Sequence, residues 1–320
     1  MPEFRWNPLL DTYTMVATNR QHRPHLRKDY CPFCPGNGNV PAQYDVLAYP
    51  NDFPVMSLDV QDGKPKGEGI FRRKEAVGAC EVILYSPEHT KKLYELSDEH
   101  VLKIVELWAE RYKALSADKR IKYIFEFENK GEEVGVTMHH PHGQLYAYSF
   151  IPSKIREELN NSKKYYQQHG TNLFADLNKA EKKHKQRVVY ENKGFIAYIP
   201  YFTDYPFGVF IVSKKLKVNI TQFTLGEKKD LAEMLKKITA GFDKIYDRPF
   251  PYIMSLHQTP VNEKKYTDAE QYYAFHIEFY PPLRAADKIK YYAGSEMGAG
   301  AAANPLDVDE CAAILRSKMK

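Results

Sequence analysis

The chain of 320 residues can form one large domain or two of ordinary size, and its 43% hydrophobic residues are enough for a substantial core. It contains no apolar run of about 18 residues and begins without the apolar segment of a signal peptide, which predicts a cytoplasmic protein with no membrane partner. The net charge of +5 mildly favours anionic ligands and gives no indication of nucleic acid binding.

The first half of the chain has the pattern of several strands around one long helix. Ser97 precedes apolar residues at helical spacing, from Val101 to Tyr112, and this predicts an amphipathic helix that begins at Ser97. Runs rich in β-branched and aromatic residues predict strands over 13–17, 46–49, 79–85, 121–127 and 145–150.

The second half repeats this order after a polar, lysine-rich stretch over 153–185 that predicts helix. A second amphipathic helix is expected from Thr224, and strands are expected over 188–190, 208–213, 252–256 and 273–280. The strand over 188–190 is expected to correspond to the one over 46–49. We therefore predict an α+β fold of two duplicated halves, 1–155 and 156–320. Each half is expected to be an antiparallel sheet with a long helix, and the two to be fused into one sheet-rich body.

The halves differ in the residues that carry chemistry. Alignment of their last strands places His276 opposite His140 and Glu278 opposite His142, and the second half lacks a pair of closely spaced cysteines. The full set of reactive side chains is therefore expected once, in the first half.

A histidine-rich motif, Thr137 to Gln144, precedes the strand expected over 145–150. His140, His142 and Gln144 alternate, so a strand that extended through them would place all three on one face. Such a group could bind a metal, attack an electrophile or hold a phosphate, and a histidine-rich edge loop without function would show the same composition.

Cys31 and Cys34 form a single CxxC pair, which is half of a zinc site. The alternative is two incidental small residues in a turn. His89 and His140 supply two further ligands, and four protein ligands would close a tetrahedral site, so this zinc would be structural. His142 is then not needed as a ligand, and a neutral imidazole can attack phosphorus when its other nitrogen is held by a fixed acceptor. Gln144 can donate to phosphate oxygens.

Several motifs occur in an order that resembles the galactose-1-phosphate uridylyltransferase family, the transferase branch of the histidine-triad superfamily. The resemblance covers the chain from Arg20 to the tail, and glutamine at position 144 is typical of the transferase branch. The motifs are Cys31-x-x-Cys34-Pro-Gly-Asn, Asn51-Asp52-Phe53, Ser86-Pro87-Glu88-His89, Phe127-Glu-Asn129-Lys-Gly131, His140-Pro-His-Gly-Gln144 and Phe279-Tyr-Pro-Pro-Leu283.

This resemblance implies two histidine-triad-like halves and a ping-pong exchange of UMP between UDP-glucose and galactose 1-phosphate. The substrates would be UDP-glucose, UDP-galactose and hexose 1-phosphates, His142 would carry the uridylyl group, and the protein would be a homodimer with structural zinc. Developing phosphoryl charge would be met by Gln144 with Arg20 or Arg23. The uridine pocket would be lined by Asn51, Asp52, Phe53 and Asn129, with Thr137 near the phosphates, and the tail residues Lys290 and Glu296 would reach the partner subunit's sugar site.

The sequence departs from the family pattern at two places. A second structural metal site of the family, often iron, uses one glutamate and three histidines; here Glu158, His257 and His276 match and Glu278 replaces the last histidine. That site could hold iron or zinc, or none. Near the tail, Ser295 and Ala302 replace residues that contact the hexose, which leaves the preferred hexose 1-phosphate open.

Two other functions stay open from the sequence. One is an ADP-sugar phosphorylase or adenylyltransferase of the same superfamily, because adenine and uracil pockets differ by few residues. The other is a zinc-stabilised nucleotide-binding protein without catalysis. The intact pair of His142 and Gln144 beside Asn129 is more than a binding protein needs, and it favours the transferase.

Overall fold

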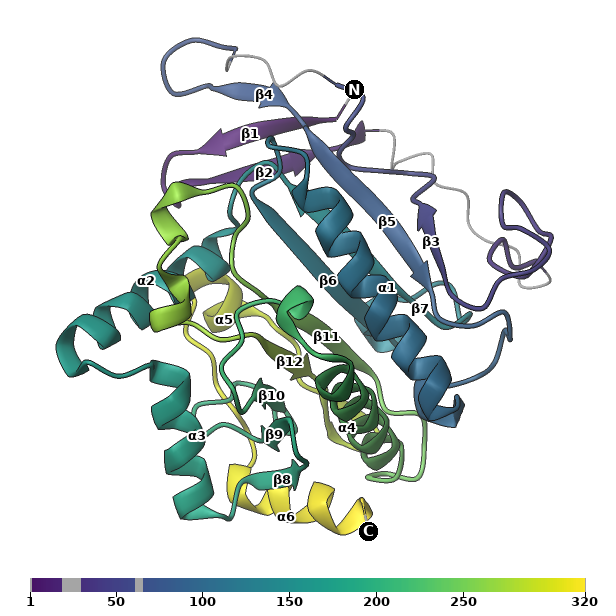
Figure 1. Cartoon of the computed structure of the whole chain (residues 1–320), viewed down its shortest axis with the longest axis vertical. Helices are drawn as coiled ribbons and strands as arrows, with labels where there is room; N and C mark the ends of the chain where they lie inside the picture. Colours follow the sequence, from purple (N-terminus) through teal and green to yellow (C-terminus); the bar gives the residue numbers. More distant parts are fainter. Residues whose placement is uncertain (1, 19–29, 61–65, 320) are drawn as a thin grey trace.

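The computed structural model describes residues 2–18, 30–60 and 66–319 (Figure 1). The strands are β1 Glu3–Asn7, β2 Thr12–Val16, β3 Leu47–Pro50, β4 Arg73–Glu75, β5 Gly78–Leu84, β6 Tyr123–Lys130, β7 His142–Tyr148, β8 Val188–Glu191, β9 Phe195–Tyr198, β10 Phe210–Ser213, β11 Tyr252–His257, β12 His276–Tyr280, β13 Leu283–Ala285 and β14 Lys288–Ile289. The helices are α1 Asp98–Ser116, α2 Ser153–His169, α3 Leu173–His184, α4 Leu225–Asp243, α5 Gly294–Ala299 and α6 Val308–Lys318, joined by short 3-10 turns.

One nine-stranded sheet runs through the molecule in the order β3-β5-β7-β6-β11-β12-β10-β9-β8, with antiparallel neighbours throughout. The order is nearly symmetric about its middle, where β6 of the first half pairs with β11 of the second from Lys130↔Tyr252 to Phe127↔Ser255. The predicted α+β fold of duplicated, fused halves is therefore confirmed. A separate sheet of β2, β1 and β4 lies at the end of the molecule away from the C-terminus (Figure 1).

The expected correspondence between the strand over 188–190 and the strand over 46–49 is wrong. By position in the sheet, β9 is the counterpart of β3, because β9 pairs with β10 as β3 pairs with β5. The strand β8 pairs beyond β9 and has no counterpart in the nine-stranded sheet on the side of the first half. The sequence comparison therefore matched the hairpin of β8 and β9 to the first half, but it gave β8 the position in the sheet that β9 occupies.

The helices α1 and α4 lie side by side on one face of this sheet (Figure 1). Their expected starts are confirmed, because Ser97 accepts a hydrogen bond from the backbone of His100 at 3.1 Å and Thr224 forms a capping box with Glu227. Each buries one apolar stripe, represented by Trp108 on α1 and Phe242 on α4. The larger hydrophobic core lies between these helices and the sheet.

The opposite face of the sheet carries a second core, to which α2 and α3 contribute. The expected helical stretch over 153–185 is two helices, because Gly170 adopts the left-handed conformation at φ 71° and Asn172 caps the next helix. The expected division of the chain between residues 155 and 156 falls in the first turn of α2.

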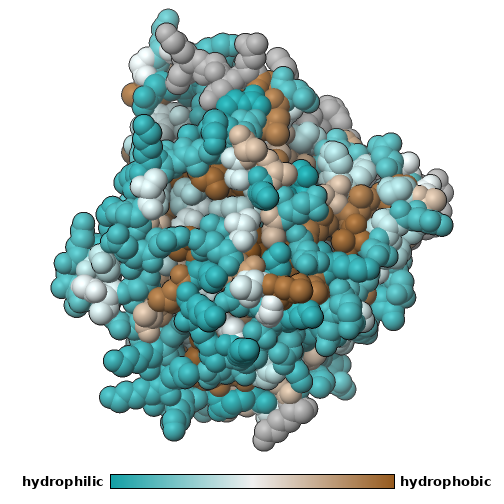
Figure 2. All heavy atoms as spheres, in the orientation of Figure 1, coloured by the Kyte–Doolittle hydropathy of each residue, from teal (hydrophilic) through white to brown (hydrophobic). Residues whose placement is uncertain are grey.

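The C-terminal helix α6 lies against the outer strand β8 (Figure 1). Arg316 of α6 donates to the carbonyl of Val188 at 2.9 Å, so a side chain satisfies a backbone acceptor at this edge. Figure 2 shows the face that carries α1 and α4, where hydrophilic side chains cover most of the surface between smaller hydrophobic areas. None of the helices in the described residues is long and apolar enough to cross a membrane.

Asp243, the last residue of α4, ties the two halves together beneath this face. Its Oδ1 accepts from the Lys130 ammonium at 2.7 Å and from the backbone of Phe250 at 2.9 Å, and its Oδ2 accepts from Tyr94 at 3.0 Å and lies 3.1 Å from the ammonium of Lys92. Burial alone would raise the pKa of Asp243, but Lys130 and the other donors outweigh it and hold the pKa below its usual range. The ionised form is therefore part of the folded state.

We predict that Asp243→Asn lowers the free energy of unfolding by about 2 kcal/mol at pH 7, because two lysines lose their shared partner. Lys92 is partly exposed, so this loss should be smaller than the cost of breaking a fully buried ion pair. Since the folded-state pKa is depressed, the stabilisation is complete above the unfolded pKa of about 4 and is lost as the pH falls below it. Urea unfolding at pH 7 and pH 3 measures both effects. Asp98→Asn is the matched control, because Asp98 of α1 pairs with Lys236 of α4 but is 75% exposed, and it should cost less than about 1 kcal/mol. Equal losses in the two variants would contradict the assignment.

Candidate active site

The strand β7 begins at His142, so His140 precedes the strand rather than alternating within it as the sequence suggested. Pro141 has no backbone N–H and cannot join the ladder there, which explains the late start. His140 is fully buried, whereas His142 and Gln144 are half-buried on one face of β7, opposite the face of Leu145 that packs under the helices. The motif therefore presents two side chains on the strand, and the third lies in the turn before it.

The ring of His142 is oriented by its own loop. Its Nδ1 lies 2.7 Å from the carbonyl oxygen of His140, and because a carbonyl can only accept, Nδ1 carries the proton. In the neutral ring the lone pair then lies on Nε2. The aromatic ring of Phe33 packs against the imidazole, with the two centroids 5.3 Å apart.

Tyr85, which follows β5, holds the residues on both sides of His142. Its backbone N–H donates to the Pro141 carbonyl at 3.0 Å, and its hydroxyl lies so close to Gly143 that a Cβ there would clash with it. The same Cβ would lie 3.2 Å from the carbonyl oxygen of Phe127. Glycine is therefore required at 143 by close packing rather than by backbone conformation.

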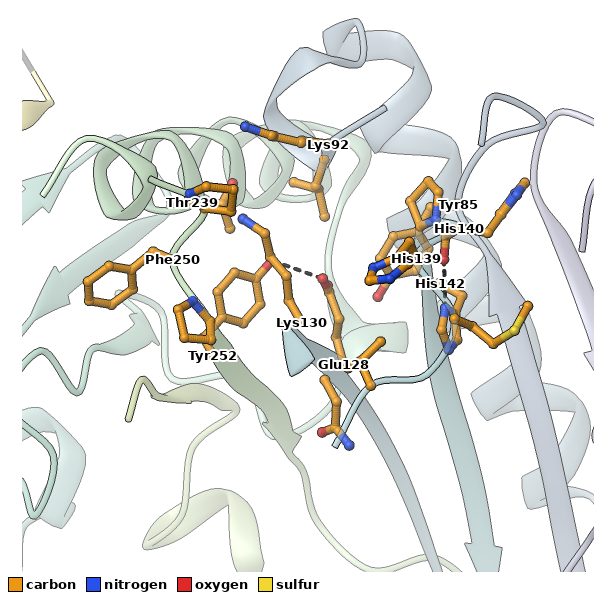
Figure 3. A pocket seen from close by; sticks show the side chains of 18 of the residues that line it. Tyr85, Lys92, Glu128, Lys130, His139, His140, His142, Thr239, Phe250 and Tyr252 are labelled. Carbon is orange, nitrogen blue, oxygen red and sulfur yellow. Dashed lines mark hydrogen bonds between the residues drawn. The ribbon is translucent and has the colours of Figure 1, made fainter. Parts of the chain in front are cut away.

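A cavity of about 620 Å³ lies beside His142 and is lined by both halves (Figure 3). His142 and His140 line one side, Tyr252 lies on the other, and Glu128 and Lys130 of β6 lie between them. The pairing of β6 with β11 thus creates a concave site at the end of the strands, where small-molecule sites commonly form.

Glu128 is a buried carboxyl in this cavity that the sequence reading did not single out. It accepts a hydrogen bond from the Tyr252 hydroxyl at 2.9 Å and is 7% exposed. Burial raises the pKa of Glu128 to about 7, against the lowering effects of Tyr252 and Lys130. The sequence held little signal for it, because Glu128 is one of several polar and charged residues of β6, together with Glu126, Asn129 and Lys130.

The expected nucleoside residues lie in two groups. Asn51, Asp52 and Phe53 form the turn after β3, where the Asn51 side chain accepts from the backbone of Phe53 at 2.9 Å and Asp52 accepts from the Tyr49 hydroxyl at 2.6 Å. Asn129 lines the same cavity as His142. Thr137 is exposed in the loop before the motif. Tyr49 was not in the expected set, although its place two residues before Asn51 would have suggested it.

The remaining expected contacts do not lie near His142 within the described chain. Arg20 and Arg23 fall outside the described residues. Lys290 and Glu296 lie 3.5 Å apart in the tail and line a cavity of about 310 Å³ that shares no lining residue with the one beside His142.

Cys31, Cys34, His89 and His140 form the first possible metal site, with all four ligand atoms within 4.8 Å of one another. The Cys34 sulfur lies 3.4 Å from His89 Nδ1 and 3.7 Å from His140 Nδ1, near the separation of about 3.6 Å that tetrahedral zinc with sulfur and nitrogen ligands requires. The opposite nitrogen of His140 lies 2.7 Å from the Ser86 carbonyl, which orients the ring. Burial lowers the pKa of His140 to about 4, so the ring is neutral. The donor set fits zinc.

Glu158, His257, His276 and Glu278 form the second possible site, again with ligand atoms within 4.8 Å of one another. His276 Nδ1 lies 2.9 Å from the Ala274 carbonyl and carries a proton, so in the neutral ring the lone pair lies on Nε2. Oε1 of Glu158 is buried and has no hydrogen-bond partner within the part of the chain that the structure describes. Two nitrogen and two oxygen donors suit a divalent ion by element, but the Lys154 ammonium lies 2.7 Å from Oε2 of Glu278 and so occupies part of the cluster.

Comparisons with known proteins agree over the whole chain. Residues 1–152 match the family model described as galactose-1-phosphate uridyl transferase, N-terminal domain, and residues 158–318 match its C-terminal domain. The galactose-1-phosphate uridylyltransferase of Thermotoga maritima is 37% identical over 317 residues, which is 99% of this chain and 98% of that protein.

Solved structures give the same result. A structure described as uridylyltransferase is 31% identical and superposes with a TM-score of 0.88, covering 99% of this chain and 98% of the other. An ADP-glucose phosphorylase from Arabidopsis thaliana with bound ADP-glucose is 22% identical with a TM-score of 0.75, covering 99% of both chains. At that identity the second comparison shows a shared fold alone.

We predict that Cys34→Ser removes zinc from the protein and lowers its unfolding temperature, because Cys34 Sγ is the atom that both histidines face. Elemental analysis and thermal unfolding, with and without a chelator, measure the two effects. Cys80→Ser alters a buried thiol outside the four-residue cluster and should leave the zinc content unchanged. A native chain purified without zinc whose unfolding temperature does not respond to chelator would contradict the site.

Proposed function

The chain belongs to the galactose-1-phosphate uridylyltransferase family, and from this we propose that His142 is the nucleophile that carries the uridylyl group between two substrates. The activity is galactose-1-phosphate uridylyl transfer, a nucleotidyl transfer of galactose metabolism with UDP-sugars and hexose 1-phosphates as substrates. The observation that supports His142 as the nucleophile is the hydrogen bond from its Nδ1–H to the His140 carbonyl, which leaves the lone pair of the neutral ring on Nε2.

In the first step, Nε2 of His142 attacks the α-phosphorus of UDP-glucose. The bond from that phosphorus to the bridging oxygen breaks, and glucose 1-phosphate leaves with the electron pair. The ring becomes a uridylyl-imidazolium whose positive charge is stabilised by the hydrogen bond from Nδ1 to the His140 carbonyl. In the second step, a phosphate oxygen of galactose 1-phosphate attacks the same phosphorus, the P–N bond breaks, and UDP-galactose forms.

Developing negative charge on the phosphoryl oxygens needs donors near Nε2. Gln144 lies two residues along β7 on the same face as His142, and its amide is the candidate donor from the described residues. Arg20 and Arg23 are candidates from the segment outside them. The close packing of Gly143 on Tyr85 keeps the strand between His142 and Gln144 in one position, which is the positioning that an in-line displacement requires.

We assign the uridine to the side of the sheet where Phe33, Tyr49 and Val82 form a small apolar cluster next to His142. Phe53 would contact the base, and Asp52, whose first oxygen accepts from Tyr49, would accept ribose hydroxyls with its second. Asn51, Asn129 and Thr137 complete the proposed pocket. This arrangement supports a uridine nucleotide as the family implies.

The acceptor sugar is the reason to propose a homodimer. Lys290 and Glu296 lie in a cavity of the tail that is separate from the one at His142, so a second subunit would have to bring them to the hexose. Zinc is proposed at the cysteine cluster, where it would fix the loop that supplies the His140 carbonyl.

We predict that His142→Ala lowers kcat by roughly a thousandfold or more while the far-ultraviolet circular dichroism stays native, because the covalent intermediate cannot form. Incubation with UDP-glucose labelled in the uridine, followed by gentle denaturation, should leave acid-labile label on the native protein and none on the variant. His169→Ala, at the exposed end of α2, is the control and should retain both label and turnover. Turnover close to native in His142→Ala would remove the nucleophile assignment.

A second prediction tests the positioning of the nucleophile. Gly143→Ala should lower kcat by about a hundredfold with little change in KM, because the new methyl group meets the Tyr85 hydroxyl and displaces the strand that carries His142. Removing that hydroxyl in the double variant Gly143→Ala/Tyr85→Phe should recover part of the loss, about tenfold. The recovery is partial because Cζ of Tyr85 would still lie 3.0 Å from the methyl group.

Tyr252→Phe is the matched control for this pair, because it removes another buried hydroxyl from the same cavity without touching Gly143. It should give no recovery when combined with Gly143→Ala. A double variant of Tyr85 no faster than Gly143→Ala alone, or a fully active Gly143→Ala, would show that this contact does not position His142.

A further inference from the structure

A lysine side chain lies in the second possible metal cluster, which consists of Glu158, His257, His276 and Glu278. Lys154, in the first turn of α2, places its ammonium 2.7 Å from Oε2 of Glu278 and 2.6 Å from the Tyr280 hydroxyl. The same ammonium lies 3.9 Å from Oε1 of Glu158 and 4.8 Å from the centre of the Tyr280 ring. It therefore contacts both carboxylates of the four-residue cluster.

These contacts occupy one of the two Glu278 oxygens that a metal could use. Oε2 of Glu278 accepts from Lys154 and from the Tyr280 hydroxyl and lies 3.8 Å from Nε2 of His257, whereas Oε1 lies 3.3 Å from Nε2 of His276. The Glu278 side chain is 5% exposed and the Lys154 side chain 57%, so a buried carboxylate meets a lysine whose side chain also reaches solvent. A carboxylate at that depth requires a positive partner, and the structure supplies it in Lys154.

The same geometry opposes a second cation. A divalent ion bound by Glu158, His257 and His276 would lie next to the ammonium that contacts Glu158 and Glu278, and like charges at such a separation repel strongly in a partly buried site. The ion would have to displace Lys154 from Glu278 or bind beside it. Either route lowers affinity relative to a cluster without the lysine.

We propose that Lys154 takes the charge-neutralising place of a metal in the second cluster, so that the cluster fastens α2 to β12 without a metal and binds divalent cations only weakly. The carboxylates of Glu158 and Glu278 supply two negative charges and the lysine supplies one positive charge. The helix is linked to the sheet by the bond from Lys154 to Glu278 and by Glu158, whose Oε2 lies 2.9 Å from Nδ1 of His257. The inference does not depend on the identity of the nucleophile, and its failure would leave the proposed uridylyl transfer untouched.

The test is a titration of the zinc-loaded protein with Mn²⁺, followed by electron paramagnetic resonance of the free ion. Mn²⁺ suits carboxylate ligands and is a poor match for a thiolate pair, so it reports on the second cluster. Lys154→Met keeps the length of the side chain and removes its charge, and we expect its Kd for one equivalent of Mn²⁺ to be at least tenfold lower than that of the native chain. Lys154→Arg keeps the charge and should stay within about threefold of native.

Two control variants show whether the change in Mn²⁺ affinity arises at the second cluster. Lys163→Met removes another ion-paired lysine of α2, one that bonds Asp268 at 2.7 Å outside the cluster, and it should not change Mn²⁺ binding. His276→Ala introduced into Lys154→Met should abolish the gain, which places the ion at the cluster. If Lys154→Met fails to fold by circular dichroism, Lys154→Gln replaces it with the same expectation. Native affinity equal to that of the Met or Gln variant, or a gain in Lys154→Arg as large as in Lys154→Met, would overturn the proposal.

Discussion

The pairing of β6 with β11 is the interaction on which the site depends. Its hydrogen bonds fix Asn129 and Lys130 of the first half beside Ile253 and Tyr252 of the second, and so make one continuous sheet from two halves. The cavity beside His142 is lined from both sides of this junction, and the Tyr252 hydroxyl reaches Glu128 across it. Asp243 strengthens the same junction from the helix layer through Lys130 and Lys92.

The sequence predicts those features that local pattern controls. The apolar stripe from Val101 to Tyr112 and the cap at Ser97 give α1 its position, and the repeated order of strands and helix predicts the duplicated halves. The turn before β7 differs from expectation because Pro141 interrupts the alternation that the spacing of His140, His142 and Gln144 suggested. The position of the outer strand β8 in the sheet was predicted wrongly, because similarity between two stretches of sequence does not indicate the order of strands in a sheet.

The features that sequence cannot predict are contacts between distant positions. Lys154 and Glu278 are 124 residues apart, and the sequence around either residue does not indicate that the two are in contact. The contact of the Tyr85 hydroxyl with Gly143 depends on the register of β5 against β7, where Leu84 lies opposite His142. Glu128 reads as one more charged residue in a strand until the fold shows which face it occupies, and burial then moves its pKa close to neutrality.

The helix α6 has a consequence for the behaviour of shortened chains. An outer strand with unsatisfied carbonyls is a template on which another molecule can add its own strand, and proteins commonly cover such edges. Here Arg316 bonds the Val188 carbonyl and α6 lies along β8. A chain cut before Val308 would keep His142, the residues of both four-residue clusters and all nine strands of the large sheet, yet it would leave the edge of β8 uncovered. Its loss of activity would then arise from intermolecular strand addition and precipitation, not from damage to the chemistry.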